Sequence, residues 1–192
     1  QAGIPVFERA QAWGAIMTHY QNALCVSGTH GKTTTTSMCA HIFLAAQRDP
    51  SIMIGGVLPA LGAGHRVGHG DTIILESCEY CNSFLSFFPT VAVILNVDAD
   101  HLDFFKDLED VKRSFRRFAE LVPETGFVVA DRDDANTMDA LSGLDRPTVT
   151  FGLDDGDVHA ANLTWHGGFA DFDAIVNGQP YAHISLSVPG VH

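Results

Sequence analysis

The sequence of 192 residues lacks any apolar run close to the ~20 residues that a membrane-spanning helix needs. It is also poor in positive charge, because 11 Lys and Arg residues face 23 Asp and Glu residues and leave a formal net charge of −12. This acidic balance disfavours nucleic acids and anionic membrane surfaces as partners. We find no signal peptide, internal repeat or low-complexity tract.

Cysteine is scarce as well, with four in the chain. Cys25 and Cys39 stand in apolar surroundings, whereas Cys78 and Cys81 form one C-x-x-C pair. A zinc site would need a second pair of ligands at suitable spacing, so a coincidental pair is favoured over metal or redox chemistry. Without a disulfide framework, a domain of this size is expected in a reducing compartment, the cytoplasm.

One segment, the run S-G-T-H-G-K-T-T-T-T from Ser27 to Thr36, is chemically the most informative. It follows a strand-like apolar stretch and precedes a helix-like periodic one. In that order, loop N–H groups, the helix dipole and the charge of Lys32 are suited to hold the phosphates of a nucleotide. The hydroxyl of Thr33 could coordinate the magnesium ion that accompanies ATP. The candidate nucleotide-binding residues of the loop are Gly28, Thr29, His30, Gly31, Lys32, Thr33 and Thr34.

The loop is a shortened form, G-T-x-G-K-T, of the pattern G-x-x-x-x-G-K-[ST], which would require a glycine at Val26. An ordinary glycine turn capped by threonine is the alternative. Four successive threonines are poor helix formers because of their β-branching. Poor helix formers at the start of a predicted helix therefore favour a functional segment over an ordinary turn.

Apolar residues make up 46% of the chain and charged residues 18%, enough for one domain with a sizeable core. Apolar runs alternate with amphipathic stretches, which predicts a mostly parallel α/β sheet with flanking helices, similar to P-loop NTPases. The glycine-rich stretch 55–70 is expected to be a loop with room for a hairpin. The expected strands are 23–26, 52–54, 72–76, 90–95, 127–130 and 148–151, and the expected helices are 8–18, 32–47, 107–122 and 134–141.

Past Gly152 the pattern changes to three alternating stretches, 157–165, 168–176 and 181–188, separated by a Gly-Gly and an Asn-Gly pair. Asn-Gly between apolar-alternating runs is a strong hairpin signal. We therefore expect residues 152–188 to form a small antiparallel β appendage.

Two polar segments follow other predicted strands: Glu76 to Glu79 and Asn96 to His101. Both would lie at C-terminal strand ends, where open α/β sheets bind ligands. Carboxylates beside a phosphate loop are typical magnesium ligands, whereas histidine is an unusual one. On residue chemistry alone, Asp100-His101 is therefore also consistent with a hydrogen-bonded turn or a general base.

Taken together, four motifs resemble the Mur ligase family, and the resemblance covers essentially the whole chain. Its ATP-dependent members build or recycle the peptide of peptidoglycan. The histidine inside the loop is most similar to the members that join L-alanine to UDP-N-acetylmuramate, although ligases that re-attach recycled murein peptides share it. The motifs are G-T-H-G-K-T-T-T-T in the loop, E-x-x-E-x-x-x-S-F-L from Glu76 to Leu85, N-x-x-x-D-H at 96–101 and V-P-G-x-H at 188–192.

Mur ligases have an N-terminal UDP-binding domain, a central ATPase domain and a C-terminal Rossmann-like domain. The resemblance implies that residues 21–192 are the central ATPase domain and that residues 1–20 are a connector from a missing N-terminal domain. The C-terminal domain is missing too, and the asparagine that contacts adenine would follow His192. The chain alone is therefore expected to ligate nothing and to bind Mg·ATP weakly.

In the implied reaction the muramyl carboxylate attacks the γ-phosphate of ATP to give an acyl phosphate, which the amine of L-alanine then converts to an amide. The resemblance makes Lys32, Glu79 and His101 the catalytic residues. Lys32 would contact the β- and γ-phosphates, Thr33 and Glu79 would bind a first Mg²⁺, and His101 would bind a second. Glu76 is the alternative carboxylate.

Further residues receive supporting roles from the same resemblance. Asn96 is counted among the nucleotide-binding residues and, with Asp100, would order the His101 loop. Ser83 and Phe84 would approach the muramyl group. Several family members carry a carbamylated lysine one helix past the Asp-His pair, but here arginines surround that place, and no carbamate is expected on Lys112.

The phosphate loop also admits two alternatives from other functional classes. A P-loop kinase or GTPase would share the loop but would not need the Asp-His segment, and the GTP-specific motif N-K-x-D is missing. A non-enzymatic nucleotide sensor is disfavoured because Lys32, Thr33, Glu79 and His101 are all present.

Overall fold

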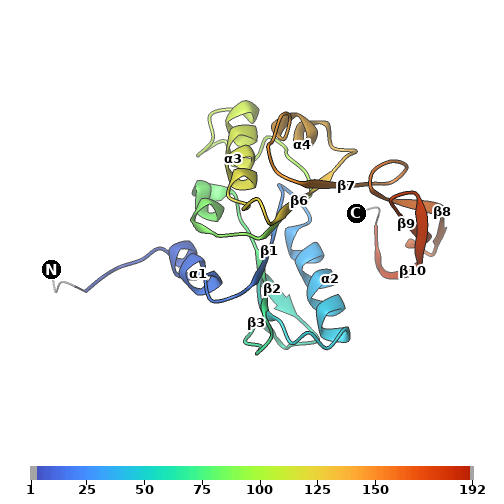
Figure 1. Cartoon of the computed structure of the whole chain (residues 1–192), viewed down its shortest axis with the longest axis horizontal. Coiled ribbons are helices and arrows are strands. Elements are labelled where there is room, and N and C mark those ends of the chain that lie inside the picture. The colour runs from blue at the N-terminus through green and yellow to red at the C-terminus, as the bar shows by residue number, and fades with distance from the viewer. Residues whose placement is uncertain (1–3, 191–192) are drawn as a thin grey trace.

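The computed structural model describes residues 4–190, in which ten strands form one sheet in the order β10-β9-β8-β7-β6-β5-β1-β4-β2-β3 (Figure 1). Residues 1–3 and 191–192 lie outside the described part, and with them the last two residues of the V-P-G-x-H motif. The strands are β1 (Asn22–Ser27), β2 (Ser51–Leu58), β3 (Ala63–Arg66), β4 (Thr72–Glu76), β5 (Val91–Ile94), β6 (Phe127–Asp131), β7 (Thr148–Gly152), β8 (Val158–His166), β9 (Phe169–Val176) and β10 (Gln179–Pro189). The helices are α1 (Arg9–Met17), α2 (Lys32–Ala45), the 3₁₀ helix η1 (Tyr80–Ser86), α3 (Leu108–Glu120) and α4 (Ala135–Ala140).

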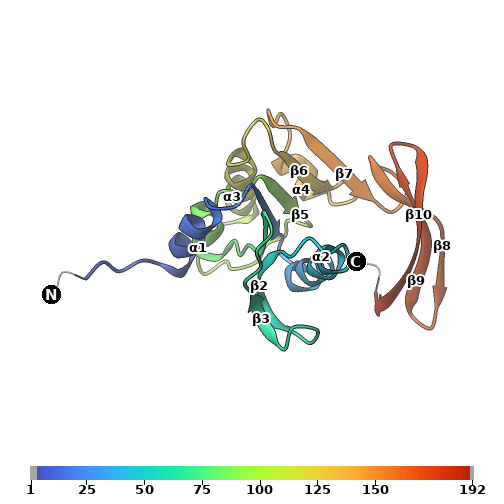
Figure 2. The ribbon, with the colours of Figure 1, turned by 60° about the horizontal axis from the view of Figure 1, so that its bottom comes forward.

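The central strands β2, β4, β1, β5, β6 and β7 run parallel, which confirms the predicted α/β class. The glycine-rich stretch 55–70 contains the hairpin for which the sequence left room, because β3 pairs antiparallel with β2. The expected loop start at 55 is wrong, since β2 continues to Leu58. Figure 2 shows α2 on one side of this sheet and α1 and α3 on the other. Helices on both faces explain why the central strands are nearly continuous apolar runs.

The antiparallel region after Gly152 joins the same sheet. Phe151 and Gly152 of β7 pair in parallel with Val158 and His159 of β8, and β9 and β10 then continue antiparallel. The expected appendage is thus an extension of the sheet that stands away from α1 and α3 in Figures 1 and 2.

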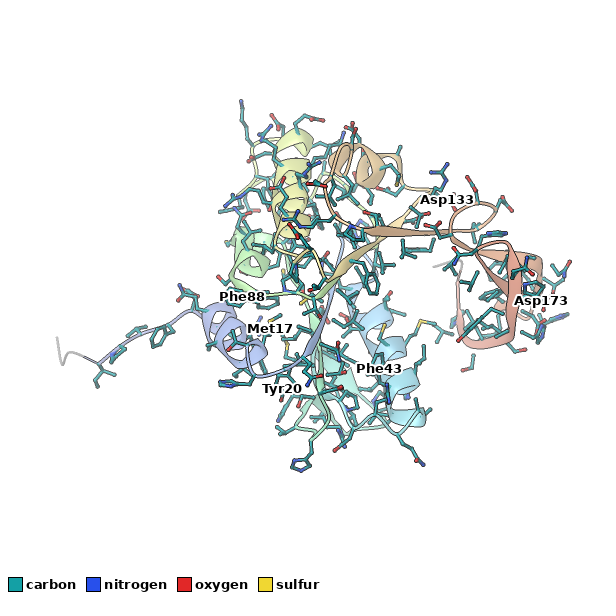
Figure 3. The ribbon with its side chains drawn as sticks, in the orientation of Figure 1. Met17, Tyr20, Phe43, Phe88, Asp133 and Asp173 are labelled. Carbon is teal, nitrogen blue, oxygen red and sulfur yellow. The ribbon has the colours of Figure 1, made fainter. Side chains whose placement is uncertain are left out.

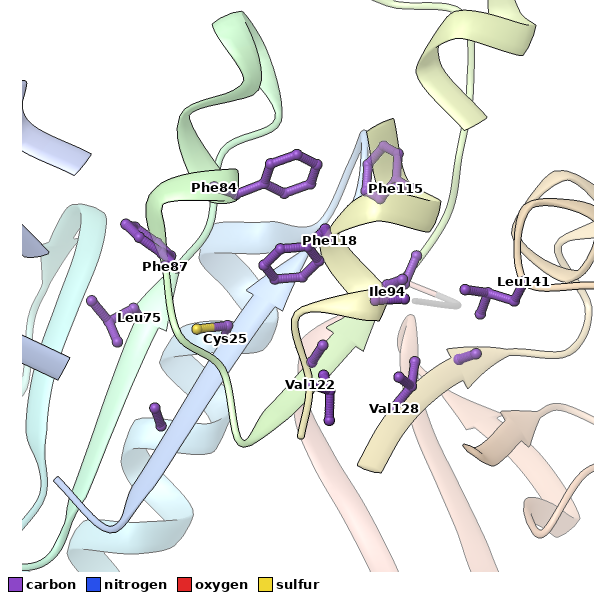
Figure 4. Close-up of a cluster of buried hydrophobic side chains, with 14 of the residues drawn as sticks. Cys25, Leu75, Phe84, Phe87, Ile94, Phe115, Phe118, Val122, Val128 and Leu141 are labelled. Atoms are coloured by element: carbon purple, nitrogen blue, oxygen red, sulfur yellow. The ribbon is translucent and has the colours of Figure 1, made fainter. Parts of the chain in front are cut away.

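An aromatic cluster fills the space between the sheet and the helices of one face (Figure 4). Phe84 of η1 stacks on Phe118 of α3 with ring centroids 4.5 Å apart, and Phe115 meets Phe84 edge-on at 5.4 Å. These three side chains are fully buried, which the apolar stripe of α3 predicts for Phe115 and Phe118. Met17 of α1 is buried in the same core, so this helix of the expected connector packs onto the domain (Figure 3).

On the outer hairpin, His183 of β10 lies between two aspartates of β9; Asp173 is labelled in Figure 3. Its Nδ1 is 2.8 Å from Oδ1 of Asp173, and its Nε2 is 3.2 Å from Oδ1 of Asp171. The hydrogen bond with Asp173 and the charge of Asp171 raise the pKa of His183 above its ordinary value of 6.5.

We expect a His183→Gln variant to be less stable than the parent chain below about pH 6 and to converge with it at higher pH. A raised pKa means that the stabilisation is complete below the unfolded pKa and is lost as pH rises through the folded one. Thermal unfolding of both proteins across this range is the measurement, with His41→Gln as control, since His41 forms no ion pair within residues 4–190. A stability difference independent of pH would contradict this prediction.

Candidate functional site

The loop between β1 and α2 occupies the centre of the sheet, at the C-terminal end of β1. Gly28 and Gly31 have φ values of 144° and 82°, a region that strongly favours glycine. A Cβ on Gly28 would also lie 2.9 Å from the Cβ of Leu95, so the loop can approach the end of β5 only with glycine here. The two glycines at the ends of the predicted loop, Gly28 and Gly31, are therefore required by the backbone conformation.

The first turn of α2 presents backbone donors to the loop. Gly31 is the N-cap residue and has no side chain with which to cap the helix, and the N–H of Thr35 makes the first intrahelical bond, to Gly31. The amides of Lys32, Thr33 and Thr34 consequently have no intrahelical acceptor. Such free N–H groups at a helix N-terminus form an anion-binding site.

Asn96 supports this loop from the neighbouring strand end. Its Oδ1 accepts the N–H of His30 at 2.7 Å, and its Nδ2 donates to the carbonyl of His30 at 3.1 Å. The N–H of Thr29 donates to the carbonyl of Asn96 at 3.0 Å. The predicted residue is thus next to the loop, but its amide is engaged with loop backbone and holds His30 in place.

Glu79, Lys32 and His101 come together although they belong to three separate segments. Nζ of Lys32 lies 3.0 Å from Oε2 of Glu79, and Nε2 of His101 lies 3.7 Å from Oε1 of the same carboxylate. The Glu79 side chain is only 2% exposed, compared with 14% for Lys32 and 34% for His101. Lys32 also donates to the carbonyls of Gly28 and Thr29, at 2.7 and 3.1 Å, so its charge stays over the loop.

Thr33 meets the other carboxylate of the motif. Its hydroxyl donates to Oε1 of Glu76 at 2.9 Å, and the N–H of Gly55 donates to Oε2 at 2.7 Å. A Cβ on Gly55 would lie 2.7 Å from Oε1 of Glu76, so a side chain at this position would displace that carboxylate from Thr33. The family resemblance assigned Thr33 and Glu79 to the same Mg²⁺. In the structure, Thr33 is instead hydrogen-bonded to Glu76, and the Glu79 carboxylate lies beside Lys32 and His101.

Sequence reasoning missed two residues beside His101. The ring of Tyr80 lies 4.6 Å from the imidazole, centroid to centroid, and its hydroxyl donates to Oδ2 of Asp103 at 2.7 Å. That hydrogen bond and the charge of Asp103 raise the pKa of Tyr80 to about 12, so the phenol keeps its proton. The only signal in the sequence is that Tyr80 directly follows Glu79.

Three other residues singled out from the sequence lie apart from this chemistry, whereas a fourth, Asp100, lies beside His101. Phe84 is fully buried against Phe115 and Phe118, so the expectation that it approaches a substrate is wrong. The hydroxyl of Ser83 donates to the carbonyl of Tyr80. Lys112 pairs with Glu109 and Asp139 on the surface, and Asp100 accepts the N–H of His101.

Cys78 and Cys81 are both free thiols. Cys81 is exposed, whereas burial raises the pKa of Cys78, so that thiol is not an activated one. Within residues 4–190, no three His, Cys, Asp or Glu side chains form a group that could hold a metal ion on their own. In the same residues, no helix has the length and apolar character to cross a membrane.

The chain is similar to known proteins over its full length. It is 46% identical over its full length to the UDP-N-acetylmuramate--L-alanine ligase of Caldanaerobacter subterraneus subsp. tengcongensis and 41% identical to that of Clostridium novyi, and it covers 42% of each. The chain therefore spans about two fifths of these curated relatives.

Two solved structures are similar to this fold. The UDP-N-acetylmuramate:L-alanyl-gamma-D-glutamyl-meso-diaminopimelate ligase of Neisseria meningitides aligns with a TM-score of 0.87 at 27% identity, over 98% of this chain and 62% of that one. The UDP-N-acetylmuramate-alanine ligase of Thermotoga maritima aligns with a TM-score of 0.78 at 26% identity, over 93% and 40%. Residues 26–192 match the family model of the Mur ligase middle domain, and because this match spans most of the chain, the chain belongs to the Mur ligase family.

Proposed function

We propose that this chain is the ATP-binding centre of a cytoplasmic ligase that joins L-alanine to UDP-N-acetylmuramate in peptidoglycan synthesis. The observation that carries the proposal is the convergence of Lys32, Glu79 and His101 beside the free amides of α2. The relatives at 41% and 46% identity, named as L-alanine ligases, support this choice of substrate. The four free thiols are compatible with a reducing cytoplasm.

The residues present fit a nucleoside triphosphate with Mg²⁺. The loop offers amide donors and one lysine to anionic oxygens. The buried carboxylate of Glu79, which lies beside Lys32 and His101, offers anionic oxygens to a cation. In the proposed complex, the amides from Gly28 to Thr33 and the side chain of Lys32 would hold the phosphates. Thr33 and Glu79 would hold one Mg²⁺, and His101 would hold a second. A bound Mg²⁺ would neutralise phosphate charge and polarise the transferred phosphoryl group.

The bond between Thr33 and Glu76 fits the same role. A hydroxyl that donates its proton to a carboxylate turns its lone pairs away from that carboxylate, where they can face a cation. Glu76 would then orient Thr33 without binding the metal itself. This arrangement keeps Glu79 for the metal, as the family resemblance suggested.

The reaction that this site would serve needs little covalent chemistry from the protein. The muramyl carboxylate would take the γ-phosphoryl group of ATP, leaving ADP, and the amine of L-alanine would then displace phosphate from the acyl group. Catalysis of phosphoryl transfer rests mainly on positioning and on charge neutralisation. Lys32 supplies the charge, and the glycine-bracketed loop supplies fixed donors that need no reorganisation.

A second candidate is a ligase that re-attaches recycled murein peptides to UDP-N-acetylmuramate. The fold similarity to the Neisseria meningitides ligase, with a TM-score of 0.87, supports this second candidate. The unrelated kinase or GTPase considered from the sequence is excluded, because the chain belongs to the Mur ligase family.

The deciding experiment measures phosphate release by the full-length protein in the presence of ATP, Mg²⁺ and UDP-N-acetylmuramate. We expect L-alanine to stimulate release and the tripeptide L-Ala-γ-D-Glu-meso-diaminopimelate to leave it at background. Stimulation by the tripeptide instead would establish the recycling ligase. Calorimetry on the present chain alone should detect only weak Mg·ATP binding, and tight binding would show that the nucleotide site is complete within it.

A further inference from the structure

Tyr80 connects the two segments that carry Glu79 and His101. It directly follows Glu79, at the start of η1, while its side chain reaches the loop from His101 to Phe104. The phenol ring lies 4.6 Å from the imidazole at an interplanar angle of 40°, and the ring of Phe104 meets it edge-on at 6.1 Å. Its hydroxyl donates to Asp103 at 2.7 Å. One side chain thus contacts three residues of the opposite loop.

His101 needs such support for two reasons. Its φ is 52°, in the left-handed region that side chains with a Cβ rarely adopt, so its surroundings must hold the turn. The turn is closed on its backbone side, because the N–H groups of Phe104 and Phe105 both donate to the carbonyl of His101. The imidazole itself is 34% exposed, and its 3.7 Å approach to Glu79 is longer than a hydrogen bond. Nδ1 of the imidazole lies 4.0 Å from Oδ1 of Asp100, which is also longer than a hydrogen bond. The backbone turn and the two carboxylates therefore leave the ring direction to the contact with Tyr80.

We propose that Tyr80, anchored by Asp103, is a positioning residue that fixes the direction of the His101 imidazole relative to the Glu79 carboxylate. This inference rests on the proposed function, in which both groups hold magnesium. The ring face packs on the imidazole and restricts its rotation, while the hydroxyl ties that ring to the loop. Outer partners of a histidine ligand typically contribute about 10- to 100-fold to metal affinity or activity.

The test uses the full-length ligase with Tyr80→Ala, Tyr80→Phe and Asp103→Asn, and Tyr181→Ala as the matched control. Tyr181 is 78% exposed on β10, outside the site. We measure Mn²⁺ binding in the presence of ADP by electron paramagnetic resonance, together with kcat and the Mg²⁺ concentration at half-maximal rate. Tyr80→Ala should weaken Mn²⁺ binding and raise the Mg²⁺ requirement by about 10-fold, with the KM for L-alanine unchanged.

The partial variants make the test independent of folding in Tyr80→Ala. Tyr80→Phe keeps the ring but loses its anchor on Asp103, so its Mn²⁺ affinity should lie between those of Tyr80→Ala and the parent enzyme. Asp103→Asn keeps an oxygen acceptor for the Tyr80 hydroxyl but removes its charge, so it should lower Mn²⁺ affinity no more than Tyr80→Phe does. The double variant should be no worse than Tyr80→Phe alone, because Asp103 acts only through that hydroxyl. The inference is overturned if Mn²⁺ affinity and the Mg²⁺ requirement stay at the parent values in Tyr80→Ala, or in Tyr80→Phe should Tyr80→Ala not fold.

The two proposals fail in different ways. If the parent enzyme releases phosphate with neither L-alanine nor the tripeptide, the proposed function is wrong, yet the Mn²⁺ measurement still reports on Tyr80. If the parent enzyme is active and the Tyr80 and Asp103 variants bind Mn²⁺ as it does, only the positioning role is wrong.

Discussion

Replacing Lys32 with alanine in the full-length ligase is expected to lower turnover by about two to three orders of magnitude, the usual loss when one preorganised charge or donor at a transition state is removed. Nζ of Lys32 lies within hydrogen-bonding distance of two loop carbonyls and of Glu79, so its charge is fixed where the phosphates would bind. Alanine would leave the amides of α2 in place but remove the only full positive charge that the loop sequence supplies. Turnover is measured as phosphate release at saturating ATP.

Lys112→Ala provides the matched control for this variant. Lys112 also forms ion pairs, with Glu109 and Asp139, but on the surface of α3, so its removal should leave turnover unchanged. Lys32→Ala should in addition destabilise the fold by roughly 3 kcal/mol, because it leaves the buried Glu79 carboxylate without its cation. Rates must therefore be compared at a temperature where circular dichroism shows both variants folded. Near-parental turnover by folded Lys32→Ala would contradict the role assigned to the lysine.

The phosphate loop could be predicted from the sequence because its signals are local. Gly28 and Gly31 are the residues that the backbone needs at positive φ, and Lys32 follows the loop directly. The central strands could be predicted equally well, because a buried parallel strand is an apolar run in the sequence whatever its neighbours are. The sequence also indicated that Glu79 and His101 follow the C-terminal ends of strands, and the family resemblance assigned both to one site. The structure adds that these strands, β4 and β5, lie on either side of β1.

What sequence patterns could not supply is the pairing of side chains across those strand ends. Whether Thr33 bonds to Glu76 or Glu79 depends on the path of η1, whose Cys81 and Asn82 have φ values of 54° and 57° that no sequence period encodes. The same path buries Phe84. Likewise, the parallel pairing of β7 with β8 arises from a short contact at Phe151 and Gly152, which alternation within each strand does not specify.

Glu79→Gln should be nearly as damaging to turnover as Lys32→Ala, with a different signature in stability. The amide keeps the shape of the side chain but cannot supply the anionic oxygens that magnesium prefers, so we expect turnover to fall by about 100-fold or more and the Mg²⁺ requirement to rise by at least about 10-fold. Lys32 would keep its two carbonyl acceptors and its partial exposure to water, so its charge would not be stranded. Stability should therefore change little, in contrast to Lys32→Ala.

The asymmetry between these two variants tests the site more sharply than either loss of activity alone. Both remove one partner of the same 3.0 Å ion pair, so a purely structural salt bridge would destabilise the fold from either side. A functional site predicts that only Glu79→Gln shifts the Mg²⁺ requirement, while Lys32→Ala acts mainly through ATP. Glu109→Gln, which alters the exposed ion pair with Lys112, should change neither quantity. Equal destabilisation by both variants with an unaltered Mg²⁺ requirement would mean that Glu79 serves the fold and that another residue, with Glu76 the first candidate, binds the metal.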